Sequence, residues 1–160
     1  MYHFAPDPGQ TKPAFYDELA KAAEALVAGE PDPVANMANL AALIWQFVPQ
    51  LNWAGFYRIQ DGELVLGPFQ GKPACIRIPL GMGVCGAAAA SGKTQLVADV
   101  HAFPGHIACD ADSRSELVVP VLRDGQVIAV IDLDSPQPAR FDGEDAKGIE
   151  MLARLVAGLL

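Results

Sequence analysis

Three stretches of the chain carry apolar residues at the three- and four-residue spacing of an amphipathic helix. The first covers residues 12–29, and we expect the helix to end at its glycine. The second follows Asp32, a favourable N-cap residue, and continues to Pro49. The third covers about residues 142–159. A short alanine-rich segment, residues 87–90, predicts a further buried helix.

Between these helices the pattern changes to the alternation of apolar and polar residues that is typical of strands. Asp-Gly pairs at 61–62 and 124–125 separate neighbouring strands and predict hairpins. This order of elements predicts a single α+β domain over residues 13–160, preceded by an irregular arm, residues 1–12. We expect a mainly antiparallel sheet of about six strands with helices packed against it. The predicted strands are 52–59, 64–66, 74–79, 94–98, 116–122 and 126–133.

The composition and net charge limit the binding partners and the cellular compartment that we expect. The 160 residues are 51% hydrophobic and 19% charged, which is typical of a globular domain that folds without a disulfide or metal. A net charge of −8 disfavours binding to nucleic acid and to anionic membranes. No apolar run approaches the ~18 residues of a membrane span. The first residues resemble no export signal and the three cysteines form no close pair, so we expect a reducing, cytoplasmic location.

One cysteine, Cys109, lies in a long polar loop that we expect to cover residues 99–114. A loop thiol is accessible, and a nearby imidazolium such as that of His106 could lower its pKa and favour the nucleophilic thiolate. The neighbouring Asp110 and Asp112 act in the opposite direction, because negative charges disfavour a thiolate. From these residues alone, a reactive thiol and an unreactive, half-buried one are equally acceptable interpretations.

A group of acids is expected on the last hairpin. Asp132 and Asp134 are two residues apart and therefore point to the same face of a strand. If residues 123–125 form a three-residue loop, Glu116 lies opposite Asp132 with Asp134 on the diagonal. A two-residue loop would instead place Glu116 opposite Leu133 and split the group.

Three carboxylates so close together destabilise one another unless something compensates their charge. A divalent metal, a ligand ammonium group or a retained proton would do so, and a protonated carboxyl could act as a general acid. The alternative is a solvated strand end that only starts a turn.

Aromatic residues and glycines complete the candidate features. Trp53 and Tyr57 alternate onto one strand face, where they are either core residues or an aromatic wall beside a ligand. We expect no metal ligands, because structural zinc sites normally use close pairs such as C-x₂₋₄-C and the chain has no such pair. Cys109 with His106, three residues before it, is the only near pair. The glycines of residues 81–86 read G-x-G-x-x-G, but we interpret them as a turn into a short helix rather than a dinucleotide site.

Five blocks of the sequence resemble the free methionine-(R)-sulfoxide reductases, which are single GAF domains. The resemblance extends over about residues 13–160, and all three cysteines fall within the matching blocks. These blocks are residues 52–57, 67–75, 81–86, 106–110 and 131–135.

The resemblance implies a role for each cysteine. In that family the cysteine matching Cys109 is the nucleophile, and the one matching Cys75 forms a disulfide with it. The cysteine matching Cys85 is auxiliary. The nucleophile attacks the sulfoxide sulfur and becomes a sulfenic acid, and the disulfide that follows is reduced by thioredoxin.

The resemblance also implies a substrate pocket and partners. Acids matching Glu116, Asp132 and Asp134 line the pocket, and the tryptophan matching Trp53 packs on the substrate methyl group, with Tyr57 in the same block. We favour Glu116 as the proton donor to the sulfoxide oxygen. The family uses no prosthetic group and is commonly homodimeric. The alternatives are a GAF module that senses a small molecule, or a cysteine redox switch without a substrate.

Overall fold

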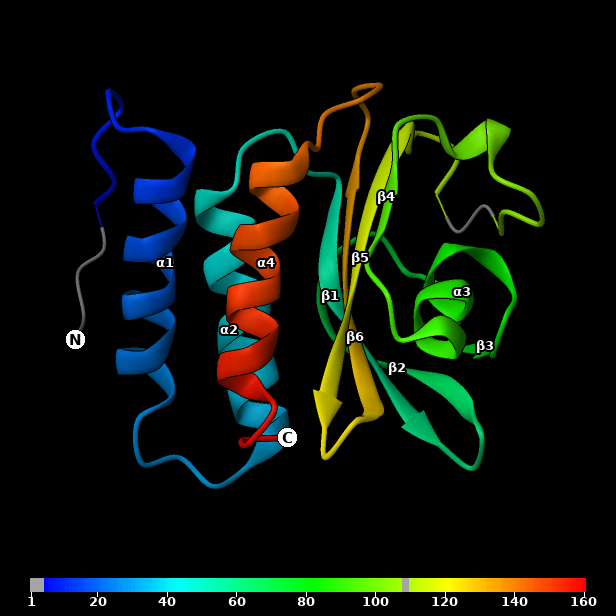
Figure 1. The fold of residues 1–160 in the computed structure, drawn as a ribbon, viewed down its shortest axis with the longest axis horizontal. Helices are drawn as coiled ribbons and strands as arrows, with labels where there is room; N and C mark the ends of the chain where they lie inside the picture. Colours follow the sequence, from blue (N-terminus) through cyan, green and yellow to red (C-terminus); the bar gives the residue numbers. More distant parts are fainter. Residues whose placement is uncertain (1–4, 108–109) are drawn as a thin grey trace.

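Six strands form one antiparallel sheet in the order β3-β2-β1-β6-β5-β4 in the computed structural model, which describes residues 5–107 and 110–160 (Figure 1). Helices lie against both faces of this sheet, so the predicted α+β class is confirmed. The strands are β1 Trp53–Gln60, β2 Glu63–Gly71, β3 Arg77–Pro79, β4 Gln95–Val97, β5 Ser115–Arg123 and β6 Gln126–Ser135. The helices are α1 Lys12–Val27, α2 Pro33–Phe47, α3 Gly83–Ser91, the 3₁₀ turn η1 Val100–Ala102 and α4 Gly143–Val156.

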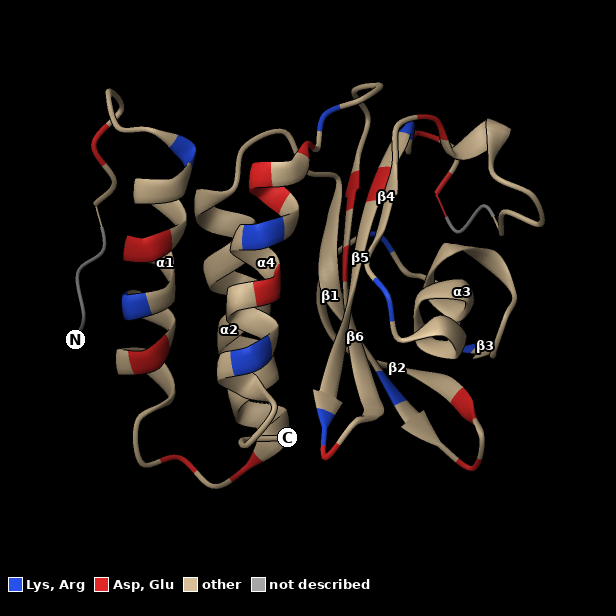
Figure 2. Cartoon of the chain, in the orientation of Figure 1, with Lys and Arg blue, Asp and Glu red and all other residues tan. Residues whose placement is uncertain are grey.

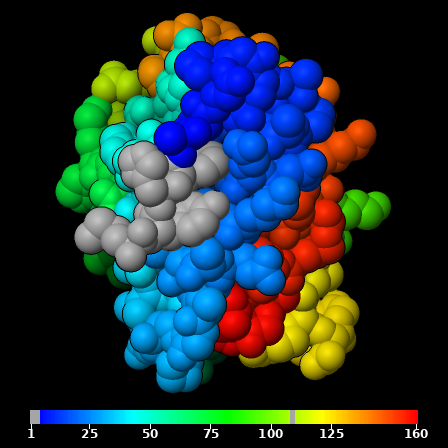
Figure 3. Space-filling model, turned by 90° about the vertical axis from the view of Figure 1, so that its left-hand side faces the viewer, coloured from blue at the N-terminus to red at the C-terminus, as the bar shows by residue number. Residues whose placement is uncertain are grey.

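Three long helices cover one face of the sheet. Helix α2 packs on β1 and β2, and α4 packs on β5, while α1 forms an outer layer against both helices. The space-filling view of this side shows α1 lying across the face with α4 beside it (Figure 3). The core between helices and sheet is the larger of the two cores and includes Leu19, Leu40, Phe56 and Ile149. No helix in the described ranges is long and apolar enough to cross a membrane.

Helix α3 and the connecting loops cover the opposite face of the sheet (Figure 1). Trp53 and Tyr57 point to this face, while the residues between them, Ala54 and Phe56, belong to the core on the other side. The alternation predicted for this strand is therefore confirmed. The functional pocket described below lies on the α3 side.

Capping residues explain where the helices begin. The Asp32 carboxylate accepts the backbone N–H of Ala35, as predicted for the start of α2. At α4, the side chain of Asp142 accepts the N–H groups of Glu144 and Asp145, and the Asp145 side chain accepts the N–H of Asp142 in return.

The outer helix α1 is joined to α4 by a buried hydrogen bond and a close ring contact. The Tyr16 hydroxyl donates to Asp145 Oδ1 at 2.8 Å, and both residues are almost fully buried. Gly148, one turn further along α4, lies against the Tyr16 ring so closely that a Cβ atom there would be 2.1 Å from Tyr16 Cγ. The glycine is therefore required for the approach of the two helices.

Three predicted elements differ clearly in length from those observed. Strand β3 covers only Arg77–Pro79, whereas we expected a strand over residues 74–79. Strand β2 extends to Gly71 rather than ending at residue 66, because an irregularity opposite Phe56 lets the pairing with β1 resume at Gly55–Phe69. Helix α3 begins at Gly83 rather than residue 87. As predicted, the glycines form the turn into this helix, and a Cβ at Gly86 would lie 2.5 Å from the Pro79 carbonyl oxygen.

Candidate active site

The β5–β6 hairpin turns through two residues, Asp124 and Gly125, both with positive φ (52° and 77°). The three-residue loop that we expected is therefore wrong. With Arg123 paired to Gln126, this turn alone would place Glu116 opposite an apolar residue and separate the acids.

A β-bulge in β6 reverses that effect. Leu122 pairs with Val127, but Val121 pairs with Ala129, so Ile128 is an extra residue in β6. The register beyond the bulge shifts by one position, and Glu116 then lies opposite Asp134, with Asp132 on the diagonal. The expected group of three acids is thus present, although the directly opposed pair is Glu116–Asp134 rather than Glu116–Asp132.

The three acids face α3 from the middle of the sheet, where Glu116 and Asp132 are buried and Asp134 is half-buried. Glu116 and Asp132 are each only 6% exposed. Figure 2 shows the acidic segments at the same end of β5 and β6. Burial raises the pKa of Glu116 well above its usual value, with repulsion from Asp132 and Asp134 adding to the effect. Burial likewise raises the pKa of Asp134 and brings the pKa of Asp132 to about 7. At neutral pH the group therefore retains protons.

Aromatic rings form the wall beside these acids. Trp53 lies opposite Asp134 in the β1–β6 pairing and stacks on Tyr57 and on Phe69, with ring centroids 5.8 and 5.2 Å away. Its indole N–H donates to the Lys72 carbonyl oxygen at 3.1 Å, and the Tyr57 hydroxyl donates to the Cys75 carbonyl oxygen at 3.0 Å. The wall therefore fixes the loop between β2 and β3 as well as lining the pocket.

Gly55 makes room for this stack. It lies between Trp53 and Tyr57 on the same strand face and pairs with Asp132 of β6. A Cβ at this position would be 2.4 Å from Phe69 Cβ and 2.8 Å from the Trp53 ring. A side chain here would therefore displace the aromatic wall.

The first turn of α3 forms the side of the pocket that lies opposite the sheet. Gly83, Val84 and Cys85 line the pocket, and no side chain caps the start of this helix. The free backbone N–H groups of a helix N-terminus favour an anionic group nearby. The pocket therefore has hydrogen-bond donors on the helix side and carboxylates on the sheet side.

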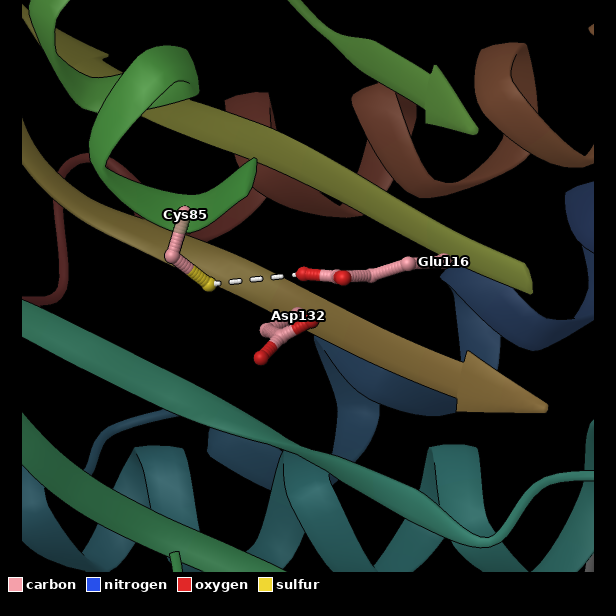
Figure 4. A group of neighbouring side chains, drawn as sticks. All are labelled: Cys85, Glu116 and Asp132. Carbon is pink, nitrogen blue, oxygen red and sulfur yellow. Dashed lines mark hydrogen bonds between the residues drawn. The ribbon is translucent and has the colours of Figure 1, made fainter. Parts of the chain in front are cut away.

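Cys85 is a free thiol that reaches the acids from α3. It is 4% exposed, and its Sγ lies 3.9 Å from Glu116 Oε1 (Figure 4). Burial and the negative charges of Asp132 and Glu116 raise the pKa of this thiol well above its usual value. The thiol is therefore protonated at neutral pH when the pocket holds no cation.

A polar cluster at the pocket mouth joins two loops. Lys72 Nζ lies 3.2 Å from Asp110 Oδ1 and 2.6 Å from Asp112 Oδ2. The Asn52 amide donates to Asp110 Oδ2 at 3.1 Å and to Ser113 Oγ at 3.0 Å. Hydrogen bonding by the Asp112 N–H, together with the Lys72 and Asn52 contacts, lowers the pKa of Asp110. Lys72, Asn52 and Ser113 were not among the predicted site residues, because their partners lie 38–61 residues away in the chain.

The structure brings most of the predicted site residues to this one pocket. Ala74 lines it, which places the backbone beside Cys75 at its edge. His106 also lines it, and burial, with a smaller effect from His101, lowers the pKa of its imidazole. Cys109 lies outside the described residues, so its predicted role as nucleophile and its pairing with Cys75 stay predictions.

The fold and the pocket define a GAF domain, and a family model for that domain matches residues 35–160. The chain belongs to the GAF family and, within it, to the free methionine-R-sulfoxide reductases. The Escherichia coli protein of that name is 50% identical over 88% of this chain and 86% of its own length. The Saccharomyces cerevisiae protein of that name is 44% identical over 91% of this chain and 85% of its own.

A solved structure agrees with this assignment. The Neisseria meningitidis free methionine-R-sulfoxide reductase, determined in complex with its substrate, superimposes with a TM-score of 0.91 at 46% identity. The match covers 99% of this chain and 93% of that one. The expected family and fold are thus confirmed over nearly the whole chain.

Proposed function

We propose that this chain reduces free L-methionine-(R)-sulfoxide to L-methionine. The observation that carries the proposal is the enclosure of three carboxylates between an aromatic wall and the start of α3. Glu116 and Asp132 are buried, and Asp134 is half-buried. Relatives that share this fold at 44–50% identity are free methionine-R-sulfoxide reductases.

The charges of the pocket match those of a free amino acid. Carboxylates on the sheet side would compensate an α-ammonium group, while the uncapped N-terminus of α3 and Lys72 would attract the α-carboxylate. A peptide-bound methionine has neither charge, and placing an amide there leaves a buried carboxylate unpaired, at a cost of about 2–5 kcal/mol. The same wall of Trp53 offers the thioether end an apolar surface.

The reaction itself rests on the cysteines. The Cys109 thiolate attacks the sulfoxide sulfur, the oxygen takes up a proton, and methionine leaves as Cys109 becomes a sulfenic acid. The Cys75 thiol condenses with the sulfenic acid, releasing water and forming a disulfide. An external dithiol, thioredoxin, restores both thiols by exchange. No prosthetic group is needed for these steps.

The proton for the sulfoxide oxygen would come from the acidic group. Glu116 is the donor that we favour, because its buried carboxyl has a raised pKa and therefore keeps a proton at neutral pH. Asp132 and Asp134 would then face the ammonium group. A thiol-based cycle requires a reducing compartment, which supports the cytoplasmic location and the dithiol partner. We also propose the homodimer that is common in the family.

Turnover on separated epimers tests the proposal. The protein is incubated with thioredoxin, its reductase and either epimer of free methionine sulfoxide, and methionine is measured. We expect product from the R epimer alone and none from N-acetylmethionine sulfoxide. No turnover with either epimer would contradict the enzymatic function and leave a sensor or a redox switch as alternatives. Oxidation of Cys75 by peroxide without substrate would then favour the redox switch over the sensor.

A further inference from the structure

The floor of the pocket brings together three potential metal ligands from three different elements. Cys85 comes from α3, Glu116 from β5 and Asp132 from β6 (Figure 4). One ligand atom of each lies within 4.8 Å of the other two, and all three side chains are buried. A tetrahedral zinc ion holds its ligands about 2.0–2.3 Å away, so a contraction of about 1 Å would bring them into coordination.

An unpaired atom points to a missing ligand. Asp132 Oδ1 is buried and has no hydrogen-bond partner among the described residues. The whole residue is only 6% exposed. A buried carboxylate oxygen without a partner costs free energy that a bound cation would recover. The contact between Cys85 Sγ and Glu116 Oε1 is long, at 3.9 Å, so little would be lost by replacing it.

We propose that Cys85, Glu116 and Asp132 form a binding site for Zn²⁺ at the floor of the pocket. One sulfur and two carboxylate oxygens suit a cation of borderline softness better than Mg²⁺ or Ca²⁺, which prefer oxygen ligands alone. Three protein ligands leave a fourth position open toward the pocket, where a water molecule completes the tetrahedron.

Metal binding and proton release are linked at this site. A thiol coordinates zinc as a thiolate, and the carboxyls must also lose the protons that they hold at neutral pH. The negative charges that face the site from β6 include Asp134, which is not a ligand but favours the cation. Zn²⁺ binding should therefore weaken as the pH falls.

The site overlaps the place where the substrate ammonium would lie, so zinc and the amino acid would exclude each other. The metal would therefore act as a reversible inhibitor rather than a cofactor. Its binding does not depend on the proposed activity, because the ligands are side chains of the folded protein and not of the substrate.

The test uses the full chain carrying Cys75→Ser and Cys109→Ser, which leaves Cys85 as its one thiol. Co²⁺ is titrated as a spectroscopic substitute for Zn²⁺, and Zn²⁺ affinity is measured by competition with a chromogenic chelator. We expect one equivalent of Co²⁺ with the visible absorption of tetrahedral coordination and a thiolate charge-transfer band. Adding Zn²⁺ should remove both.

Variants in the same background identify the ligands. Cys85→Ser should abolish the charge-transfer band. Both Cys85→Ser and Asp132→Asn should weaken Zn²⁺ binding more than about 100-fold, which is more than the loss of a residue that only supports a ligand would cause. Asp134→Asn is the matched control, since it removes a carboxylate from the same pocket but not a ligand, and should weaken binding less than either. Circular dichroism checks that each variant is folded. Absence of stoichiometric binding, or binding that survives both ligand substitutions, would overturn the proposal.

Discussion

The ammonium group of Lys72, in the loop after β2, lies 3.2 Å from the carboxylate of Asp110, which directly follows Cys109 in the sequence. The same ammonium contacts Asp112, and Lys72 is only three residues from Cys75. The contact therefore ties together the two segments that carry the proposed nucleophile and its resolving partner. Because the lysine side chain is 61% exposed, solvent screens the contact and it adds little to the stability of the fold.

We predict that Lys72→Met slows disulfide formation without preventing the first chemical step. In single turnover at saturating methionine sulfoxide, where weaker attraction of the α-carboxylate no longer limits the rate, methionine release should stay near wild type. A sulfenic-acid trap such as dimedone should capture Cys109 more often. Lys72→Arg should restore the wild-type fraction of trapped Cys109. Added salt screens the ion pair and should raise the trapped fraction of the wild type toward that of Lys72→Met. Lys93→Met, an exposed lysine outside the pocket lining, is the control and should change nothing. Equal trapping in all four proteins would contradict this role.

The buried acids make the stability of the free protein depend on pH. The pKa of Asp132 is raised to about 7 by burial, so the folded state binds more protons than the unfolded state between about pH 4 and pH 7. The free energy of unfolding should therefore fall as the pH rises through this window. Asp132→Asn removes the contribution of this carboxyl and should be at least about 1 kcal/mol more stable than wild type at pH 8, with the difference shrinking at pH 5.

Urea denaturation at both pH values measures this effect. Glu144→Gln, an exposed acid at the start of α4, is the control and should leave the pH dependence unaltered. A difference between Asp132→Asn and wild type that grows toward acid pH would show that the carboxyl is stabilised in its charged form, contrary to the burial argument.

Substitution of Glu116 separates proton donation from ammonium binding. Glu116→Gln should lower kcat by about 10²–10⁴-fold, the usual contribution of a general acid, with a smaller change in KM. Asp134→Asn should instead raise KM and reduce the preference for free over N-acetylated substrate. Steady-state kinetics with both substrates give the comparison. If the two variants exchange these effects, Asp134 rather than Glu116 is the proton donor.

The contact between α1 and α4 should be sensitive to a single methyl group. Gly148→Ala places a Cβ inside the Tyr16 ring contact, and overpacking of this kind typically costs about 1–3 kcal/mol. Thermal unfolding should therefore begin at a lower temperature. Gly143→Ala, at the first position of the same helix, meets nothing within 4 Å and should have no such effect. Since Tyr16 is far along the chain from the acids and does not line their pocket, catalytic constants at low temperature should be unchanged.

The hydrophobic pattern predicted the elements well because helices and strands each bury one face. Their apolar residues therefore recur at the period of a helix or of a strand. Asp32 and the glycines of residues 81–86 also carry local signals, since capping and tight turns depend on nearby backbone geometry. The register of the last hairpin could not be obtained in this way. Its bulge packs both Ile128 and Ala129 toward the helices, a choice that depends on the shape of the core and not on neighbouring residues.

The residues of the site divide in the same way into those that the local sequence predicts and those that it does not. The alternation of Trp53 with Tyr57 and of Asp132 with Asp134 placed four residues on the correct face. Lys72 was missed because its partners are 38 and 40 residues away. Cys85 was expected to be auxiliary, and only the packing of α3 on the sheet places its sulfur beside Glu116. Contacts between distant segments carry no signature within a short stretch of sequence.

The extra residue in β6 has a consequence for comparing GAF domains. Ile128 is the one residue of β6 between Gln126 and Ser135 that has no partner on β5. Deletion of Ile128 would therefore leave regular pairing from the turn to the acids, with Glu116 still opposite Asp134. One additional residue between Gly125 and Asp132, if it paired regularly, would instead turn the acids toward the three long helices while every motif letter stayed the same. Comparison of GAF domains should therefore count the residues in this interval as well as match their identities.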